Sequence, residues 1–209
     1  MDWTALYLKT SGLKVFILGT GEVATRRANR FLDHGAIVRM AGSSMDDDLK
    51  GKGAFLHSTD EADELVKWAD LVVVASGDKE LCDHVSRISE DKLVNRADLP
   101  YDGDIIVPTS FSIGDVEISI FTGGKSPLMA RQLRKKIQAI ITEEDIAEIE
   151  LQDYSRSLLK EKLPDQKDRR DYLYKIFEDE DIKELIKSGE IDRAKAVIYE
   201  SIERDFDDT

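Results

Sequence analysis

The chain has 209 residues and a net charge of −13, and 35% of its side chains are charged, compared with about 25% in a typical globular domain. Its length allows one large domain or two small ones, and its acidity makes duplex nucleic acid an unexpected partner. No apolar run approaches the roughly 20 residues of a membrane-spanning helix, and the first residues do not resemble a signal peptide, so we expect no membrane contact.

The first predicted elements form a strand, a glycine turn, a helix and a second strand. Residues 14–18 are a short apolar run of β-formers, typical of a strand buried on both faces. Gly19 and Gly21 interrupt it, and residues 23–32 then follow a helical pattern that Gly35 is placed to end. Residues 36–40 form the next strand, which completes a βαβ unit.

Strands and short helices continue to alternate as far as Pro108. We expect further strands at residues 54–56, 71–75, 92–95 and 104–107, and helices at residues 60–68 and through residues 81–88. This alternation predicts an α/β fold with a mostly parallel, doubly wound sheet.

Beyond Pro108 the pattern changes to an antiparallel hairpin. Residues 110–113 and 116–121 flank Gly114-Asp115, a two-residue loop with glycine first that suits a type II′ turn. Apolar and polar residues alternate along the second strand, which predicts one exposed face. We expect this hairpin to pair with a second subunit.

The rest of the chain is predicted to be helical. Ser126 can cap, and Pro127 can begin, a helix that runs to about Ile141. The charge-rich part from about residue 142 is divided by Pro164, and it ends with helices at about residues 181–189 and 194–206.

The segment Gly19-Thr20-Gly21-Glu22-Val23-Ala24 lies between the first strand and the first helix. Gly19 permits a tight turn, Gly21 lets the backbone approach a pyrophosphate, and Ala24 allows close packing of the helix on the strand. The start of the helix offers free N–H groups and a positive dipole end to phosphates. This context predicts a dinucleotide site at residues 19–23, and a tight turn without a ligand is the alternative.

The second strand ends without the acidic residue that commonly binds a ribose. Ser43, just beyond it, can hydrogen-bond a ribose hydroxyl instead. Residues 46–48 are aspartates with no arginine beside them, and they would repel the 2′-phosphate of NADP. We therefore expect NAD as the cofactor, with Ser76, after the strand at residues 71–75, as a further contact.

Asn95-Arg96-Ala97-Asp98 follows the strand predicted at residues 92–95. Ligands of open α/β sheets bind at the carboxyl ends of the strands. A carboxylate at this place can act as a general base or attract a cationic nitrogen. A helix cap or a turn former is an equally good interpretation of Asp98 taken alone.

Residues 122–127, Thr-Gly-Gly-Lys-Ser-Pro, come just before the helix that Ser126 caps. The two glycines expose backbone N–H groups, and positive charge is concentrated in an otherwise acidic chain at Lys125, Arg131, Arg134, Lys135 and Lys136. This combination favours an anion site. The alternative is a solvated basic helix face, although a plain turn does not need two glycines, a lysine and a capped helix.

The other reactive residues show no pattern. His34, His57 and His84 lack the spacing of metal ligands, so we predict no resident metal. The one cysteine, Cys82, cannot form an internal disulfide, and we interpret it as a buried hydrophobic residue. A lone thiol fits a reducing compartment, which predicts a cytoplasmic location.

Taken together, the motifs resemble the precorrin-2 dehydrogenase family, which includes the N-terminal module of siroheme synthase. The resemblance rests on Gly-x-Gly-x-Val-Ala-x-Arg at residues 19–26, Asn-x-x-Asp at residues 95–98, and Thr-Gly-Gly-x-Ser-Pro-x-x-Ala-Arg-x-x-Arg at residues 122–134. The third motif is the most specific, because it is not a general feature of Rossmann folds. Leu6-Tyr7-Leu8 is also similar to the opening of the family, and the likeness covers about residues 5–140.

The resemblance implies a Rossmann-type NAD-binding domain at residues 1–108, a dimerisation and substrate-binding region at 109–141, and a small helical domain at 142–209. It implies NAD-dependent oxidation of precorrin-2, a tetrapyrrole, to sirohydrochlorin by a homodimer; some members also insert iron to give sirohaem. Asp98 takes the position of the essential aspartate of the family, which removes a proton or handles metal. The implied substrate contacts are Asn95, Thr122, Gly123, Gly124, Lys125, Ser126 and Arg131.

Two features depart from the family pattern. Ser76-Gly77-Asp78 lacks the expected Ala-Thr sequence, and Arg96 and Tyr101 stand where many members are more apolar. The alternative functions are a Rossmann dehydrogenase acting on another acidic substrate and a non-enzymatic NAD-binding scaffold.

Overall fold

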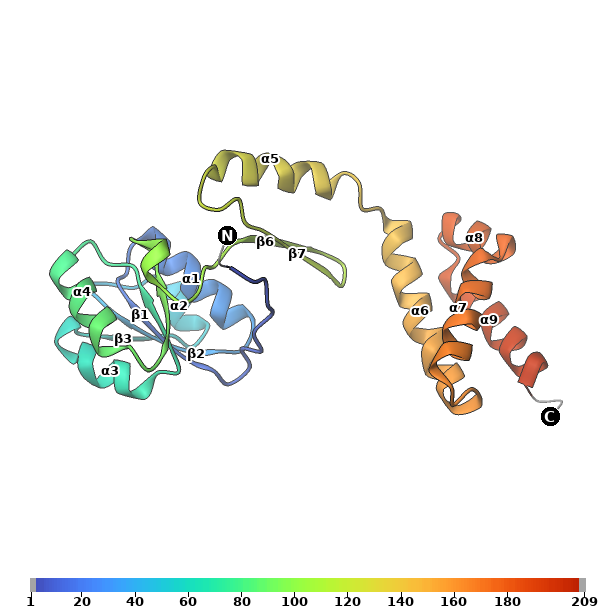
Figure 1. The fold of residues 1–209 in the computed structure, drawn as a ribbon, viewed down its shortest axis with the longest axis horizontal. Helices are drawn as coiled ribbons and strands as arrows, with labels where there is room; N and C mark the ends of the chain where they lie inside the picture. The colour runs from blue at the N-terminus through green and yellow to red at the C-terminus, as the bar shows by residue number, and fades with distance from the viewer. Residues whose placement is uncertain (1–2, 207–209) are drawn as a thin grey trace. The chain divides into compact units, whose positions relative to one another are not determined.

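The computed structural model describes residues 3–206 and divides the chain into two compact units, Met1–Pro108 and Thr109–Thr209. Figure 1 shows that the first unit is a sheet flanked by helices and that the second is a hairpin followed by helices. The division at Pro108 lies where the sequence changes from alternating strands and helices to a hairpin. The further boundary at residue 142 stays a prediction.

The first unit is built on a five-stranded parallel sheet. Its strands are β1 (Lys14–Leu18), β2 (Ile37–Ala41), β3 (Phe55–His57), β4 (Leu71–Val74) and β5 (Leu93–Arg96). They lie in the order β3-β2-β1-β4-β5, so the chain winds to one side of β1 and then to the other. The predicted doubly wound sheet is confirmed, and its direction reverses between β1 and β4.

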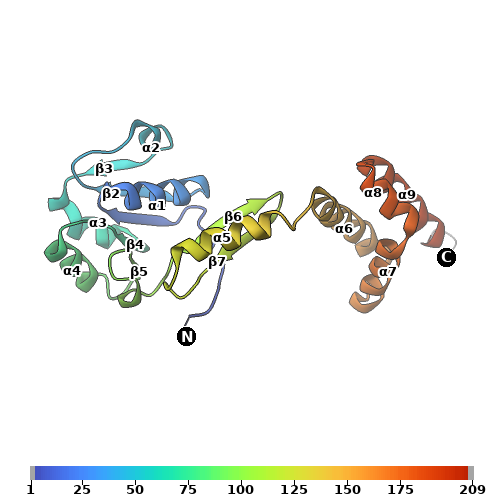
Figure 2. The same ribbon diagram turned by 90° about the horizontal axis from the view of Figure 1, so that it is seen from above.

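Helices cover both faces of this sheet (Figure 2). They are α1 (Glu22–Asp33), α2 (Asp47–Gly51), α3 (Ala62–Trp68) and α4 (Lys79–Ile88), with 3-10 turns at Thr59–Glu61 and Pro100–Asp102. From β1, Val15 and Ile17 pack with α1, while Phe16 and Leu18 pack with α3 and α4. Burial on both faces explains the unbroken apolar run of β1, in which each large side chain stabilises the fold by about 2 kcal/mol.

The strand predicted at residues 104–107 is wrong. The N–H groups of Asp104 and Ile105 both donate to the carbonyl of Val94, at 2.8 and 3.1 Å, and the carboxylate of Asp104 accepts the N–H of Val94 at 3.1 Å. A turn therefore covers the outer edge of β5 at one residue and does not pair along it. The segment continues to Pro108 as irregular chain.

Two arginines of α1 hold the end of this segment. Nη1 of Arg27 donates to the carbonyl of Val107 at 2.9 Å, and Nη1 of Arg30 donates to the carbonyl of Pro108 at 2.7 Å. Burial, together with the charges of Arg26 and Arg30, lowers the pKa of Arg27 to about 10. The helix that starts at the glycine loop is thus tied to the segment that leaves the first unit.

The second unit begins with an antiparallel hairpin formed by β6 (Thr109–Ile113) and β7 (Val116–Ile120). Gly114, the first loop residue, has a φ of +52°, whereas Asp115 has a negative φ. This combination agrees with the predicted type II′ turn.

The helices that follow are α5 (Pro127–Gln138), α6 (Glu143–Lys162), α7 (Gln166–Glu178), α8 (Glu180–Lys187) and α9 (Ile191–Phe206). α5 starts as predicted, because the hydroxyl of Ser126 accepts the N–H of Met129 at 3.1 Å. It ends at Gln138 rather than near Ile141, because Thr142 takes the extended conformation of a cap and starts α6 in a capping box with Asp145.

Apolar residues of α6 to α9 form one core, which includes the fully buried Leu151, Leu159, Ile198 and Ile202. Pro164 separates α6 from α7, and Gly189, with a φ of +72°, follows the end of α8 as predicted. Over residues 3–206, no helix combines the length and the apolar character that crossing a membrane requires.

Candidate functional site

Gly19 lies at the carboxyl end of β1, at the point where the sheet reverses direction. Its φ is +111°, and a Cβ on this residue would lie 2.3 Å from the carbonyl oxygen of Ala75, which follows β4. Its N–H donates to the carbonyl of Ala41 in β2 at 2.8 Å. Only glycine fits here, because the turn is packed between the ends of both neighbouring strands.

Gly21 and the first two residues of α1 are exposed. Gly21 has an ordinary φ of −76°, and a Cβ added to it would meet no atom within 4 Å. The N-cap residue, Gly21, has no side chain to cap this helix, so the first N–H groups of α1 are available to an anion. Glu22 and Val23 are exposed at the helix start, while Ala24 is fully buried against the sheet. The geometry is that of a phosphate-binding helix start.

The neighbouring loops join this site through close contacts. Thr20 packs against Gly42, where an added Cβ would lie 2.5 Å from the Thr20 methyl group, and exposed Ser43 comes next in the chain. Ser76 adjoins Gly19, and its hydroxyl accepts the N–H of Asp78 at 3.2 Å. The structure therefore brings the predicted residues Gly19, Thr20, Gly21, Ser43 and Ser76 to one edge of the sheet. The sequence analysis missed Gly42, which only its position directly after β2 could have indicated.

Two of the three aspartates beyond Ser43 lie beside lysines. Nζ of Lys50 lies 2.6 Å from the Asp47 carboxylate, and Nζ of Lys52 lies 3.6 Å from that of Asp48. Hydrogen bonding and charge attraction from Lys50 lower the pKa of Asp47. The segment is less negative than its three aspartates alone suggest.

Asp98 follows β5 and is bound by Arg96 from the end of that strand. Nε of Arg96 donates to Oδ1 of Asp98 at 2.9 Å, and Nη2 donates to Oδ2 at 2.6 Å. The same guanidinium donates to the Ser86 hydroxyl and to the Asp83 carboxylate of α4, both at 3.0 Å. The Arg96 side chain is 5% exposed and that of Asp98 is 27% exposed, so of these two side chains only the carboxylate reaches the surface.

These contacts stabilise the ionised form of Asp98. The hydrogen bonds from Arg96 lower the pKa of the carboxyl group most, and the main-chain N–H groups of Asp98 and Leu99 lower it further, against the opposing effect of burial. A carboxylate stabilised in this way is a weak proton acceptor at neutral pH. Of the two roles predicted for Asp98, the geometry favours a fixed negative charge over a general base.

Asn95 lies beneath this loop. It is 2% exposed, and its Nδ2 donates to the carbonyl of Ile105 at 2.9 Å, whereas its Oδ1 is buried with no hydrogen-bond partner. The contact holds the segment after Asp98 against β5. Its role in substrate binding stays a prediction.

In the second unit, residues 122–126 form a compact loop before α5. Gly123 and Gly124 have φ values of +63° and +67°, which side chains rarely adopt. The Thr122 hydroxyl donates to the carbonyl of Ser126 at 3.2 Å and accepts the N–H of Ser126 at 3.4 Å. The side chains of Lys125 and Arg131 are exposed. The loop is therefore ordered by its own hydrogen bonds, with its positive charges at the surface.

Cys82 is buried as predicted, and its thiol donates to the carbonyl of Ser76 at 3.4 Å. Burial raises the pKa of this thiol. His57 and His84 lie beside the carboxylates of Glu61 and Asp63, at 3.0 and 2.8 Å. In the part of the chain that the structure describes, no three His, Cys, Asp or Glu side chains are grouped to hold a metal ion.

Comparison with known proteins identifies the family. A family model described as "Putative NAD(P)-binding" matches residues 6–109. Over 196 residues, the chain is 32% identical to the "Putative precorrin-2 dehydrogenase" of Methanocaldococcus jannaschii, with 87% of this chain and 93% of that protein covered. The chain belongs to the precorrin-2 dehydrogenase family.

Other relatives agree with this placement. The precorrin-2 dehydrogenase of Methanosarcina barkeri is 31% identical over 193 residues, with 87% of this chain and 85% of that protein covered. A siroheme synthase of Actinobacillus pleuropneumoniae is 26% identical over 205 residues, which is 95% of this chain and only 42% of the synthase. A solved structure titled "SirC, precorrin-2 dehydrogenase" matches 97% of this chain with a TM-score of 0.77 at 23% identity, which shows the same fold.

Membership of the precorrin-2 dehydrogenase family confirms the resemblance drawn from the three motifs, and the matched structure confirms the predicted fold class. The nucleotide-binding character of the first unit is confirmed by the family model. The roles of individual site residues are not tested by these similarities and stay predictions.

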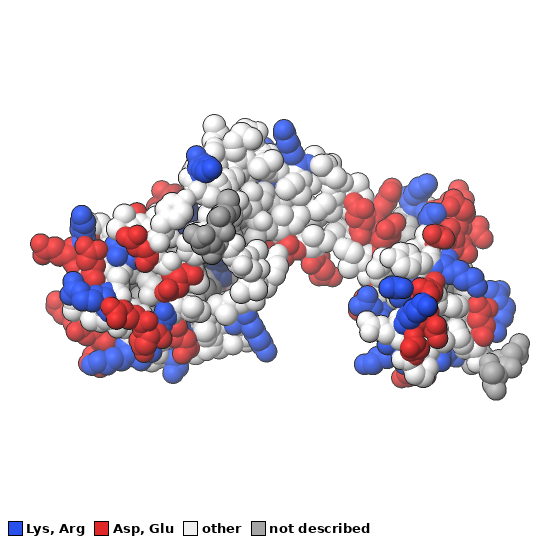
Figure 3. Space-filling view, viewed as in Figure 1, with Lys and Arg blue, Asp and Glu red and all other residues white. Residues whose placement is uncertain are grey.

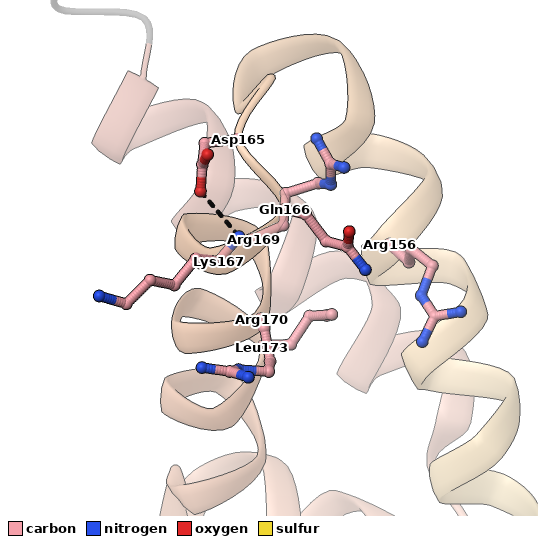
Figure 4. A pocket seen from close by; sticks show the side chains of 7 residues that line it. All are labelled: Arg156, Asp165, Gln166, Lys167, Arg169, Arg170 and Leu173. Atoms are coloured by element: carbon pink, nitrogen blue, oxygen red, sulfur yellow. Dashed lines mark hydrogen bonds between the residues drawn. The ribbon is translucent and has the colours of Figure 1, made fainter.

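The helical part of this dehydrogenase family member also holds a cavity of about 620 Å³ between α6 and α7. It is lined by Arg156, Asp165, Gln166, Lys167, Arg169, Arg170 and Leu173. In Figure 4 the side chains of Lys167 and Arg170 extend away from Arg156, so the positive charges do not converge. Arg169 is already bound, since its Nη1 donates to the carbonyls of Leu163 and Pro164.

Proposed function

We propose that this protein oxidises precorrin-2 to sirohydrochlorin with NAD as the hydride acceptor. The observation that carries the proposal is the packed Gly19 turn, which leaves the start of α1 open at the reversal point of the sheet. This is the place where a dinucleotide binds in such sheets, and it belongs to a chain of the precorrin-2 dehydrogenase family.

The residues of the first unit have distinct roles in this proposal. The N–H groups at the start of α1, at Glu22 and Val23, bind the pyrophosphate, and Gly21 leaves room for it. Thr20 and Ser76 line the two sides of the turn, and Ser43 hydrogen-bonds the adenosine ribose. NAD supplies the hydride acceptor, and the protein supplies its position.

The substrate is a macrocycle with many carboxylates, so it needs a local positive surface on an acidic protein. Lys125 and Arg131 are exposed cations, one in the glycine loop and one in the first turns of α5. We assign substrate binding to the loop residues Thr122, Gly123, Gly124, Lys125 and Ser126, together with Arg131, and to Asn95 beneath Asp98.

Asp98 acts in this proposal as an ionised carboxylate. Loss of hydride leaves positive charge on the macrocycle, and a fixed negative charge stabilises it. The bidentate contact with Arg96 supports this role, because it holds the carboxylate in one orientation.

We also propose that the active form is a homodimer in the cytoplasm, joined through the hairpin and α5. Within the second unit, Figure 3 shows few charged side chains over these elements and many over α6 to α9. Leu128, Met129 and Ile140 are exposed by 65%, 47% and 72%, which is unfavourable in water unless a partner covers them. Sedimentation equilibrium of the full chain tests this, and a monomer at micromolar concentration would contradict it.

The test of the activity is an anaerobic absorbance assay of precorrin-2 with NAD. We expect NADH and sirohydrochlorin to appear together, and we expect Asp98→Ala to lower kcat/KM by about a hundredfold or more. Asp102→Ala, which removes an exposed carboxylate from the same loop, is the matched control and should keep full activity. Binding of NAD without either product, by folded wild-type protein, would refute the proposal and favour a scaffold. Addition of Fe²⁺ to the product mixture tests metal insertion separately.

A further inference from the structure

We infer that Arg96 is a positioning residue that holds Asp98 as a fixed anion for the positive charge developed on the substrate. This inference rests on the proposed function, and it assigns a role to a residue that departs from the apolar pattern of the family. Arg96 itself is 5% exposed and has no access to the substrate, so it acts only through Asp98.

The guanidinium of Arg96 connects three elements of the first unit. It extends from the end of β5, donates to Ser86 and Asp83 on α4, and holds both oxygens of Asp98 on the following loop. The fork of two parallel N–H donors fixes the plane of the carboxylate as well as its distance. Asp98 lies on an irregular loop, but Arg96 thereby fixes its carboxylate relative to β5 and α4.

Stability alone is a weak reason for such a buried cation. Replacement of a buried ion pair by apolar residues is often neutral or stabilising, and a valine or leucine at the end of a strand would bury surface without desolvating a charge. The contacts of Arg96 instead hold a carboxylate in one orientation and favour its ionised form. Arg96, Asp83 and Asp98 together carry one net negative charge, and both carboxylates reach the surface while the guanidinium stays buried.

Removal of Arg96 would change the ionisation of this group. Asp83 and Asp98 both lie within 3.0 Å of the same Nη2 atom, so without the guanidinium two carboxylates would repel each other across a short gap. Cys82 on α4 also interacts electrostatically with Asp98 and Arg96, and burial raises the pKa of its thiol, so it carries no charge in the acid range. His84 of the same helix pairs instead with Asp63, at 2.8 Å. The acid limb is the fall of kcat/KM at low pH. A shift of this limb to higher pH would thus report protonation of the carboxylates.

The experiment compares Arg96→Met, which removes charge and fork, with Arg96→Lys, which keeps the charge and loses the fork. The kcat/KM for precorrin-2 is measured against pH at saturating NAD, and the NAD dissociation constant reports an intact first unit. For Arg96→Met we expect an acid limb about 1–3 pH units higher and a kcat/KM at least tenfold lower at neutral pH. For Arg96→Lys we expect the acid limb to stay near that of the wild type and kcat/KM to fall.

Asp83→Asn is the matched control, because it removes one partner of Arg96 and leaves the contact with Asp98 in place; we expect a near wild-type profile. The inference would be overturned if Arg96→Met showed the same pH profile, the same kcat/KM and the same NAD affinity as the wild type. If Arg96→Met does not fold, wild-type kcat/KM in Arg96→Lys would overturn it instead. Absence of turnover by the wild type would refute the proposed function, a result distinct from either.

Discussion

An alanine at position 19 would place its Cβ 2.3 Å from the carbonyl oxygen of Ala75, a separation at which main chain has to move. The φ of +111° at Gly19 adds strain, because side-chain-bearing residues held in such rare conformations cost about 1–3 kcal/mol. Forcing a methyl group into a packed position costs about 1–3 kcal/mol more. We expect Gly19→Ala to lower the free energy of unfolding of the first unit by about 2–6 kcal/mol and to abolish NAD binding.

The chain offers matched controls for each contribution. Gly12 has a φ of +78° with no atom within 4 Å of an added Cβ, so Gly12→Ala carries conformational strain of about 1–2 kcal/mol without overlap. Gly21 has an ordinary φ and open space, so Gly21→Ala should leave stability unchanged or raise it by about 0.4–1 kcal/mol. Its methyl group would still occupy the space that a pyrophosphate needs, so NAD affinity should fall.

Urea unfolding followed by tryptophan fluorescence measures these differences. The two tryptophans, Trp3 and Trp68, both belong to the first unit, so the signal reports that unit without the helices of the second. Equal unfolding midpoints for Gly19→Ala and Gly12→Ala, with wild-type NAD affinity in both, would show that the contact of Gly19 with Ala75 does not constrain the loop.

Three further predictions concern other parts of the molecule. Leu159→Ala, at a fully buried position in α6, should destabilise the second unit by about 2–5 kcal/mol, as measured by circular dichroism during urea unfolding. The transition followed by tryptophan fluorescence should stay in place. A shift of both transitions would contradict the independence of the two cores. Asp98 has a lowered pKa in the folded state, so its contribution to stability is complete above its unfolded pKa of about 3.9 and is lost as the pH falls through its folded pKa. The difference in unfolding free energy between the wild type and Asp98→Asn should therefore shrink below about pH 4. A difference that stays constant with pH would refute the ion pair. Arg27→Met should change the stability of the first unit by less than about 1 kcal/mol, because the lost hydrogen bond to Val107 is offset by removal of a buried Nε without a partner; a large loss in urea unfolding would show that the tie to the end of the unit is essential.

The sequence predicted those elements whose cause is local. The strand at residues 14–18 is buried on both faces, and its unbroken apolar run indicates this burial directly. Residues 104–107 look similar, yet their hydrogen bonds go to Val94, and the carbonyls that follow accept from α1. These partners are distant in the sequence, so no pattern within the segment could distinguish a turn held by arginines from a strand.

The candidate site likewise contains residues that could be predicted from local sequence and residues whose partners are distant in the sequence. The Gly19 turn was predictable, because its requirement for glycine follows from the tight connection between a strand and a helix. Arg96 was visible only as a departure from a family pattern, since its partners Ser86 and Asp83 lie on another helix. The aspartates at residues 46–48 were interpreted as free negative charges, whereas Lys50 and Lys52 neutralise part of that charge.

The surroundings of Asp98 also favour one of the chemical roles that its position allows. A general base works best when its pKa is near the working pH, and Arg96 moves the pKa of Asp98 in the opposite direction. The same contacts fix an ionised carboxylate. In the proposed reaction, this anion needs no reorganisation when hydride loss makes the macrocycle positive. In the proposed reaction, the proton that accompanies oxidation leaves to solvent or to another group, and Asp98 stabilises the positive charge that hydride loss leaves on the macrocycle.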